Sequence, residues 1–252
     1  MMESRRLKLT IVYDNHAYEP GLRTGWGFSC LVEYGGQVML FDTGGDSQGL
    51  LANMATLGID ASEIGGVVLS HSHGDHTGGL SGLLQMAGEG LTVFVPRSFP
   101  RRFKEAVRAR AQSFGKLRTS LVEVQESREI GEGVYTTGEM GRGIIEQSLM
   151  VRTEEGLVVV TGCAHPGIVE IVGRAKALWG DGVYLVLGGF HLGGKGRREM
   201  EGILSEFRRL GVRKVAPCHC TGERAMGMFR REYGEDYVQV GAGRVVRVPA
   251  SG

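Results

Sequence analysis

The sequence predicts an α/β (α+β) fold in which two sheets lie between layers of helices, a four-layer αββα sandwich. Short apolar segments with the length and β-branched content of strands alternate with segments of helical periodicity in both halves of the chain. The 42 glycines stand singly or in pairs between these segments, as in a chain with many short strands and turns. Since no linker, repeat or long charge run divides the 252 residues, we expect a single domain over residues 1–252.

The first half of the chain begins with strands. We expect them over residues 7–13, 28–34 and 37–41, with a hairpin at Gly35-Gly36, because two glycines supply the positive φ of a two-residue turn. Leucine and methionine spacing predicts a helix over residues 47–57 that stops at Gly58. The next expected elements are a strand at 67–69, a helix from near 76 to 86, a strand at 91–95 and a basic helix over 99–114.

The second half starts with short β segments between residues 121 and 160, punctuated by glycines. Helices and strands then alternate. We expect helices over 168–179, 198–210 and 223–233, with strands at 183–187 and 212–216 between them. Strands mixed with helices in both halves support the sandwich.

Composition indicates a globular protein with 42% hydrophobic and 23% charged residues. A net charge of +1 gives no reason to expect a nucleic-acid or membrane partner, and no apolar run reaches the length that spans a bilayer. The first residues lead directly into a strand without an export signal, so we expect a cytoplasmic protein whose four cysteines are thiols. The basic helix over 99–114 has three possible roles: a lid, a contact in a homo-oligomer, or a face exposed to solvent.

The segment His71-Ser72-His73-Gly74-Asp75-His76 places three imidazoles and one carboxylate directly after the strand expected at 67–69. Imidazole nitrogen and carboxylate oxygen are the ligand types that hold zinc, manganese or iron. A loop can fold these donors around metal ions, whereas a regular strand would point alternate residues apart. The segment therefore predicts a metal site.

Each later histidine also follows an expected strand. His165, together with Cys163, comes after residues 158–160, His191 after 184–187, and His219 after 215–216. Ligands gather at the carboxyl ends of strands in α/β architectures. These strands would therefore deliver their donors to one shared site.

The motif HSHGDH, with Phe41-Asp42-Thr43-Gly44 upstream, resembles the signature of the metallo-β-lactamase superfamily. Two further segments of that family recur in order, TGCAHP at 161–166 and PCHCT at 217–221, so the resemblance covers most of the chain. It implies two β-sheets packed face to face between helices, with a metal centre on one edge of the sandwich.

The resemblance also implies a centre of two divalent metal ions, with zinc favoured and manganese or iron as alternatives. His71 and His73 correspond to ligands of the first metal. Asp75, His76 and His219 correspond to ligands of the second.

This chain departs from the family pattern at two positions. Cys163 stands where the family has a bridging carboxylate, although a thiolate is also a good zinc ligand. The third histidine of the first metal is missing, because residues 144–149 offer only Glu146 and Gln147. His165 is our candidate substitute, and His191 is the other.

Three further residues near these ligands have structural interpretations. Asp42 either orients a ligand histidine through a hydrogen bond or caps the turn that follows its strand. Cys218 and Cys220 flank His219, and in an extended segment both thiols would point away from that imidazole as small packing residues.

Residues 161–165, 188–192 and 217–222 resemble a narrower group within the superfamily. That group includes the archaeal enzyme of methanopterin biosynthesis that joins a dihydropterin methyl diphosphate to a ribofuranosyl-aminobenzene 5′-phosphate. A basic loop bears on the substrate, because Lys195, Arg197 and Arg198 surround the start of an expected helix. The loop is either a phosphate cradle for a small anionic substrate or a solvated loop.

Three functions remain open. The first is the pterin transferase, in which the metals and the loop at 193–198 would neutralise a departing diphosphate. The second is a metallo-hydrolase of a phosphoester, thioester or lactone, in which a metal-bound hydroxide attacks and Asp75 orients it. The third is a non-catalytic metal-bound sensor. In either enzyme, Asp75 and His191 are the candidate catalytic residues.

Overall fold

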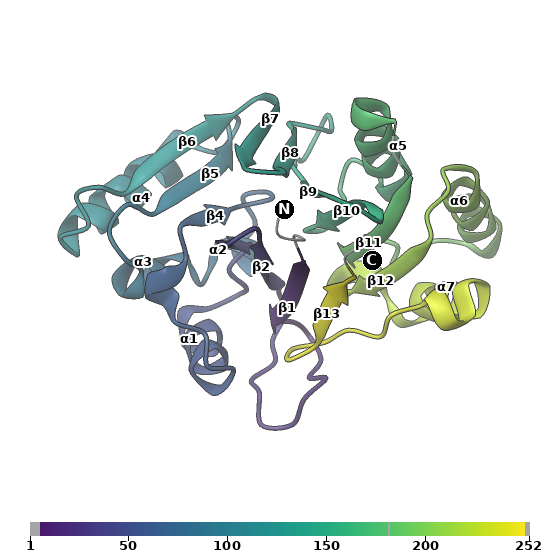
Figure 1. The fold of residues 1–252 in the computed structure, drawn as a ribbon, viewed down its shortest axis with the longest axis horizontal. Coiled ribbons are helices and arrows are strands. Elements are labelled where there is room, and N and C mark those ends of the chain that lie inside the picture. Colours follow the sequence, from purple (N-terminus) through teal and green to yellow (C-terminus); the bar gives the residue numbers. More distant parts are fainter. Residues whose placement is uncertain (1–5, 181, 250–252) are drawn as a thin grey trace, which may run out of the picture.

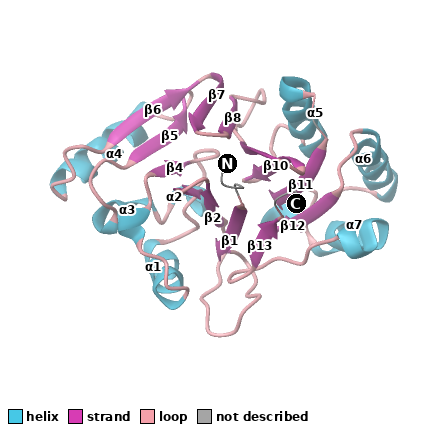
Figure 2. Cartoon of the chain, viewed as in Figure 1, coloured by secondary structure: helices cyan, strands magenta, loops and turns pink. Residues whose placement is uncertain are grey.

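The computed structural model describes residues 6–180 and 182–249, and within them two β-sheets pack face to face (Figure 1). Helices cover the outer face of each sheet (Figure 2). The expected αββα sandwich is confirmed.

In this part of the chain the first sheet has seven strands, in the order β13-β1-β2-β3-β4-β5-β6. Their bounds are Leu7–Tyr13 (β1), Ser29–Tyr34 (β2), Gln37–Phe41 (β3), Gly66–Val68 (β4), Thr92–Pro96 (β5), Ser120–Val124 (β6) and Val245–Val248 (β13). The pairs from β13 to β3 are antiparallel, and the pairs from β3 to β6 are parallel. The expected hairpin joins β2 to β3, where Gly35 and Gly36 have φ of 57° and 78°.

The second sheet, counted over the same residues, has six strands in the order β12-β11-β10-β9-β8-β7. Their bounds are Glu126–Gly131 (β7), Val134–Gly138 (β8), Leu149–Thr153 (β9), Gly156–Thr161 (β10), Val183–Gly189 (β11) and Lys214–Cys218 (β12). The strands β10, β11 and β12 run parallel to one another. Apart from Thr161 and Lys214 at strand ends, they are apolar, because both faces of this part of the sheet are covered.

The helices lie in two outer layers. The first layer contains α1 (Ser47–Thr56), α3 (Leu80–Met86) and α4 (Arg101–Ser113), and the second contains α5 (Ile168–Trp179), α6 (Arg197–Arg209) and α7 (Glu223–Tyr233) (Figure 1). Among the described residues, the core has three layers: one between the sheets, and one between each sheet and its helices. A short 3₁₀ turn, η2 (His219–Thr221), follows β12.

Two features differ from expectation. The helix expected from near 76 to 86 is two helices, α2 (Gly74–Thr77) and α3, because the amide of Gly78 also bonds to the carbonyl of Gly44 and the chain passes close to that segment. A Cβ on Gly79 would lie 2.1 Å from the carbonyl oxygen of Thr43, so only glycine allows this approach. The strand β13 was not foreseen.

None of the helices in the described part of the chain combines the length and the apolar character that crossing a bilayer requires.

Candidate metal centre

The segments after β4, β10, β11 and β12 converge at one edge of the sandwich. The ring of His71 lies 4.6 Å from that of His73, 4.3 Å from that of His76 and 4.8 Å from that of His165. The ring of His219 lies 5.0 Å from that of His76. These histidines come from three strand ends far apart in the sequence, and all five point into one space.

The donors at this edge form two groups. One consists of His71, His73 and His165, and the other of Asp75, His76, Cys163 and His219. Within each group, every ligand atom lies within 4.8 Å of the others. In the second group, Nε2 of His76 lies 3.2 Å from Sγ of Cys163 and 3.5 Å from a carboxylate oxygen of Asp75.

The unbonded nitrogens of this centre fit metal ions. Nε2 of His71, His165 and His219 is buried and has no hydrogen-bond partner among the described residues. A buried polar atom left without a partner costs free energy, so its retention at three converging imidazoles needs an explanation. A divalent cation would be the missing partner of these nitrogens, because neutral imidazole binds metal through such a free nitrogen.

Asp42 fixes the orientation of two of these rings. One carboxylate oxygen accepts from Nδ1 of His76 at 2.7 Å and from the hydroxyl of Ser70 at 2.7 Å. The Ser70 hydroxyl in turn lies 2.9 Å from Nδ1 of His71, and the Ser70 amide donates to the other carboxylate oxygen at 2.7 Å. With protons held on both Nδ1 atoms, each Nε2 presents its lone pair to the centre. Of the two interpretations of Asp42, the hydrogen bond to a histidine is confirmed.

Asn15 fixes the orientation of the His219 ring. Its side-chain oxygen lies 3.0 Å from Nδ1 of His219 and accepts from the amide of Gly27, and its amide group donates to the His219 carbonyl. Sequence reasoning missed this role because the two residues are 204 positions apart. No spacing rule connects them.

Glu146 was noted only as the wrong residue type for a missing histidine, but it holds the loop that carries Cys163 and His165. Its buried carboxylate accepts from the amides of Cys163, Ala164 and His165 at 2.9–3.0 Å. Burial raises the pKa of Glu146, and the three amide donors oppose that rise. Through this loop His165 joins His71 and His73, so the structure places it where we expected a substitute.

The electrostatics favour neutral imidazoles at His71 and His165 and an ionised carboxylate at Asp75. Burial and the neighbouring His191 lower the pKa of His165 to about 4, and burial together with His76 lowers that of His71 further. Burial alone would raise the pKa of Asp75, but the imidazoles of His219 and His76, whose Nε2 atoms lie 3.3 Å and 3.5 Å from the carboxylate, hold it well below its usual range. Ligands must be deprotonated before metal binds, so these three groups are prepared for it at neutral pH. At His76, by contrast, burial is outweighed by the Asp42 carboxylate, which raises the pKa of that imidazole.

The expectation for Cys220 is wrong, whereas that for Cys218 is confirmed. Cys218 is buried in the core between the sheets. Cys220 instead faces the centre, with its sulfur 3.7 Å from the carbonyl oxygen of Cys163, because residues 219–221 form the turn η2 and the alternation of an extended strand does not apply. The thiol of Cys163 lowers the pKa of Cys220 to about 5, helped by His191.

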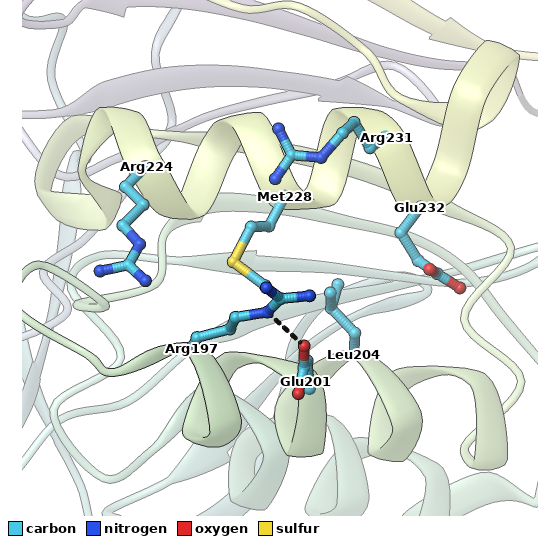
Figure 3. A pocket seen from close by; sticks show the side chains of 7 residues that line it. All are labelled: Arg197, Glu201, Leu204, Arg224, Met228, Arg231 and Glu232. Atoms are coloured by element: carbon cyan, nitrogen blue, oxygen red, sulfur yellow. Dashed lines mark hydrogen bonds and ion pairs between the residues drawn. The ribbon is translucent and has the colours of Figure 1, made fainter.

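The basic loop at 193–198 does not gather its three cations. Lys195 lines a cleft of about 700 Å³ with His165 and His191, but it pairs with Glu199. Arg197 lines a separate cavity of about 500 Å³ between α6 and α7 and pairs with Glu201 (Figure 3). Arg198 is exposed and lines neither cavity. The loop therefore does not bring three cations together as a phosphate cradle. Its charged side chains pair with glutamates or face solvent instead.

Stripping the protein with a chelator and then adding zinc is expected to raise its melting temperature. At about 100 times its Kd, one bound ion adds about 2.7 kcal/mol of stability. For a chain of this size that corresponds to about 5 to 10 °C. Differential scanning fluorimetry checks this, with calcium at the same concentration as a control, since calcium prefers oxygen ligands. Equal melting temperatures with and without zinc would contradict the metal assignment.

Comparison with known proteins agrees with this geometry. The sequence model of the metallo-β-lactamase superfamily matches residues 25–219. The chain is 30% identical to the 7,8-dihydropterin-6-methyl-4-(β-D-ribofuranosyl)-aminobenzene-5′-phosphate synthase of Methanocaldococcus jannaschii, over 94% of this chain and 95% of the relative.

Solved structures give the same result. The chain resembles the crystal structure of a metal-dependent hydrolase of the β-lactamase superfamily, with a TM-score of 0.80 and 30% identity over 97% of this chain and 100% of the other. It also shares its fold with the protein YhfI of Bacillus subtilis, at a TM-score of 0.69 and 15% identity, over 96% of this chain and 99% of the other. The family match, the full-length relatives and the converging donors lead to one conclusion: the chain is an enzyme of the metallo-β-lactamase superfamily.

Proposed function

We propose that this enzyme is a metal-dependent transferase that joins a dihydropterin methyl group, supplied as its diphosphate, to a ribofuranosyl-aminobenzene 5′-phosphate. The observation that carries the proposal is the end-to-end likeness to the synthase of Methanocaldococcus jannaschii, whose product contains both parts. The small, anionic substrates fit a metal centre at an open edge of the sandwich. The sensor alternative loses weight, because the relatives named above are enzymes.

The proposed centre holds two divalent ions. His71, His73 and His165 would bind the first, and Asp75, His76, His219 and the Cys163 thiolate would bind the second. A thiolate among imidazoles favours zinc over manganese. When bound, the ions supply positive charge that stabilises the departing diphosphate.

Trp26 adds support for a planar substrate. Its side chain is 64% exposed, which is unusual for tryptophan, and its ring lies 5.0 Å from that of His219. The neighbouring Gly27 is anchored through its amide to Asn15, the residue that also orients His219. An exposed aromatic face beside the centre suits stacking of a pterin ring.

The reaction requires no covalent bond between the enzyme and either substrate. A ring carbon or nitrogen of the acceptor forms a bond to the pterin methylene, while the bond from that methylene to the diphosphate breaks. The proton displaced from the attacking atom passes to solvent. The residues position the two partners for this reaction. Asp75, which contacts both His76 and His219, keeps its carboxylate at the centre of this arrangement.

The test is to incubate zinc-loaded enzyme with the dihydropterin methyl diphosphate, with and without the aminobenzene ribofuranosyl phosphate. We expect diphosphate release only when the acceptor is present, with the condensed product identified by mass spectrometry. Failure to form that product with fully metal-loaded protein would contradict the proposal.

The second candidate is a metallo-hydrolase, favoured by the likeness to the metal-dependent hydrolase at a TM-score of 0.80. The same experiment separates the two functions. Release of diphosphate without acceptor, or cleavage of bis(p-nitrophenyl) phosphate that a chelator abolishes, would support the hydrolase instead.

Replacing Trp26 with alanine is expected to raise the KM for the pterin substrate about tenfold, since stacking on an aromatic side chain is worth about 1 to 3 kcal/mol. Metal content should stay unchanged, because Trp26 is no ligand in the proposal. Steady-state kinetics check this, with Trp26→Phe as the control that keeps an aromatic face. A KM for Trp26→Ala equal to that of the wild type would exclude the platform.

A further inference from the structure

A third group of donors lies beside the two described above. Sγ of Cys163, Sγ of Cys220 and a ring nitrogen of His191 all lie within 4.8 Å of one another. Neither His191 nor Cys220 has a role in the proposed two-metal centre. Two sulfurs and one imidazole are a donor set that selects thiolate-binding ions such as zinc, and not calcium or magnesium.

The backbone around this group is held in uncommon conformations. Ala164, next to Cys163, has a φ of 59°, and His191 and His219 have φ of 50° and 48°. Non-glycine residues enter this region at a free-energy cost, and they persist there only when the surrounding structure holds them. Three of the four non-glycine residues with positive φ in the described part of the chain are members of this group or adjoin one, and the fourth is Asp42.

Gly189 provides the space for the sulfur. A Cβ at this position would lie 2.7 Å from Sγ of Cys220 and 2.3 Å from the carbonyl oxygen of Gly162. The end of β11 therefore accommodates Cys220 only because residue 189 has no side chain. This close packing places the Cys220 sulfur against the ends of β10 and β11.

We propose that Cys163, His191 and Cys220 form a third metal site, for a thiolate-binding divalent ion of the zinc class. The Cys163 sulfur is shared with the second metal of the proposed centre, and the inference depends on that centre in this respect only. The proposal assigns His191, a candidate catalytic residue from the sequence, to metal binding.

The proposed third metal site also bears on how an anion could bind in the adjacent cleft. His165 and His191 line this cleft together with Glu170, Glu199 and Glu206. Glu199 pairs with Lys195, the one lysine or arginine among the described lining residues, and Glu206 pairs with Arg209. Among the described lining residues, no lysine or arginine is left unpaired to hold an anion. Three protein ligands leave a coordination position for a water or a substrate oxygen, as in catalytic zinc sites. An ion at this site would thus give the cleft an attachment point for a phosphate oxygen.

The test is loading with cobalt(II), without oxygen and with excess phosphine reductant, followed by metal analysis and absorption spectroscopy. We expect about three cobalt ions per chain in the wild type, with an intense thiolate-to-cobalt charge-transfer band. Cys220→Ala and His191→Ala should each lose about one ion, and Cys220→Ala should also weaken the band. Cys30→Ala, which removes a thiol buried in the core, should match the wild type.

The outcomes separate this inference from the proposed function. About two ions per chain in all four proteins, with an unchanged band in Cys220→Ala, would overturn the third site and leave the two-metal centre intact. Fewer than two ions in the wild type would contradict the two-metal centre as well. His191 is exposed, so its variant keeps the test decisive even if Cys220→Ala folds poorly.

Discussion

Asp42→Asn is expected to lose metal from both ligand groups, although the side chain keeps its size and burial. All groups that face the carboxylate are donors: Nδ1 of His76, and the amide and hydroxyl of Ser70. An asparagine must turn its NH₂ group toward one of them. If it donates to Nδ1 of His76, the imidazole proton moves to Nε2 and blocks the lone pair that would bind metal.

We expect metal affinity to fall by about 10- to 100-fold, the range seen when a partner of a ligand histidine is removed. Competition with a chelating dye measures this directly. Asp46→Asn is the matched control, because Asp46 lies four residues away and accepts from the Gly49 amide and the Tyr13 hydroxyl without touching a histidine. Wild-type metal affinity in Asp42→Asn would show that the network does not set the tautomers.

The part of the centre that could be predicted from the sequence is the part built from neighbouring residues. His71, His73, Asp75 and His76 follow one another in a loop after a buried strand, so composition and position alone indicate metal. The fold was predictable for a related reason. Hydrophobic periodicity reports burial, and burial defines which segments face a sheet or a helix layer.

The remainder depends on contacts between distant segments. Asn15 reaches His219 only because β1 and β12 end at the same edge, and nothing local marks an asparagine as the partner of a histidine. Cys220 was misplaced because the chain turns at η2 instead of continuing as a strand. Likewise β13 pairs with β1 from the far end of the chain. In each case contacts between distant segments determine where the residue or strand lies, and single-sequence patterns contain no information about such contacts.

Glu146→Ala is expected to destabilise the fold and to empty the metal centre together. The side chain is 1% exposed, and its removal leaves the amides of Cys163, Ala164 and His165 buried without acceptors. Each such loss costs about 1 to 3 kcal/mol, so we expect the free energy of unfolding to fall on the order of 4 kcal/mol. The same loop carries His165 of the first proposed metal and Cys163 of the second, so both sites of the two-metal centre should weaken.

Urea unfolding in the presence of chelator measures the first effect without any contribution from metal, and metal analysis of the native protein measures the second. Glu139→Ala is the matched control, since Glu139 also accepts from a backbone amide, that of Ser98, but at an exposed position where water replaces the lost bond. Glu146→Gln should fall between wild type and alanine, because its carbonyl oxygen still accepts while its NH₂ group faces donors. If Glu146→Ala unfolds at the wild-type urea concentration and keeps its metal, the loop is held by other contacts. The missing third histidine would then need an explanation other than a glutamate that brings His165 into its place.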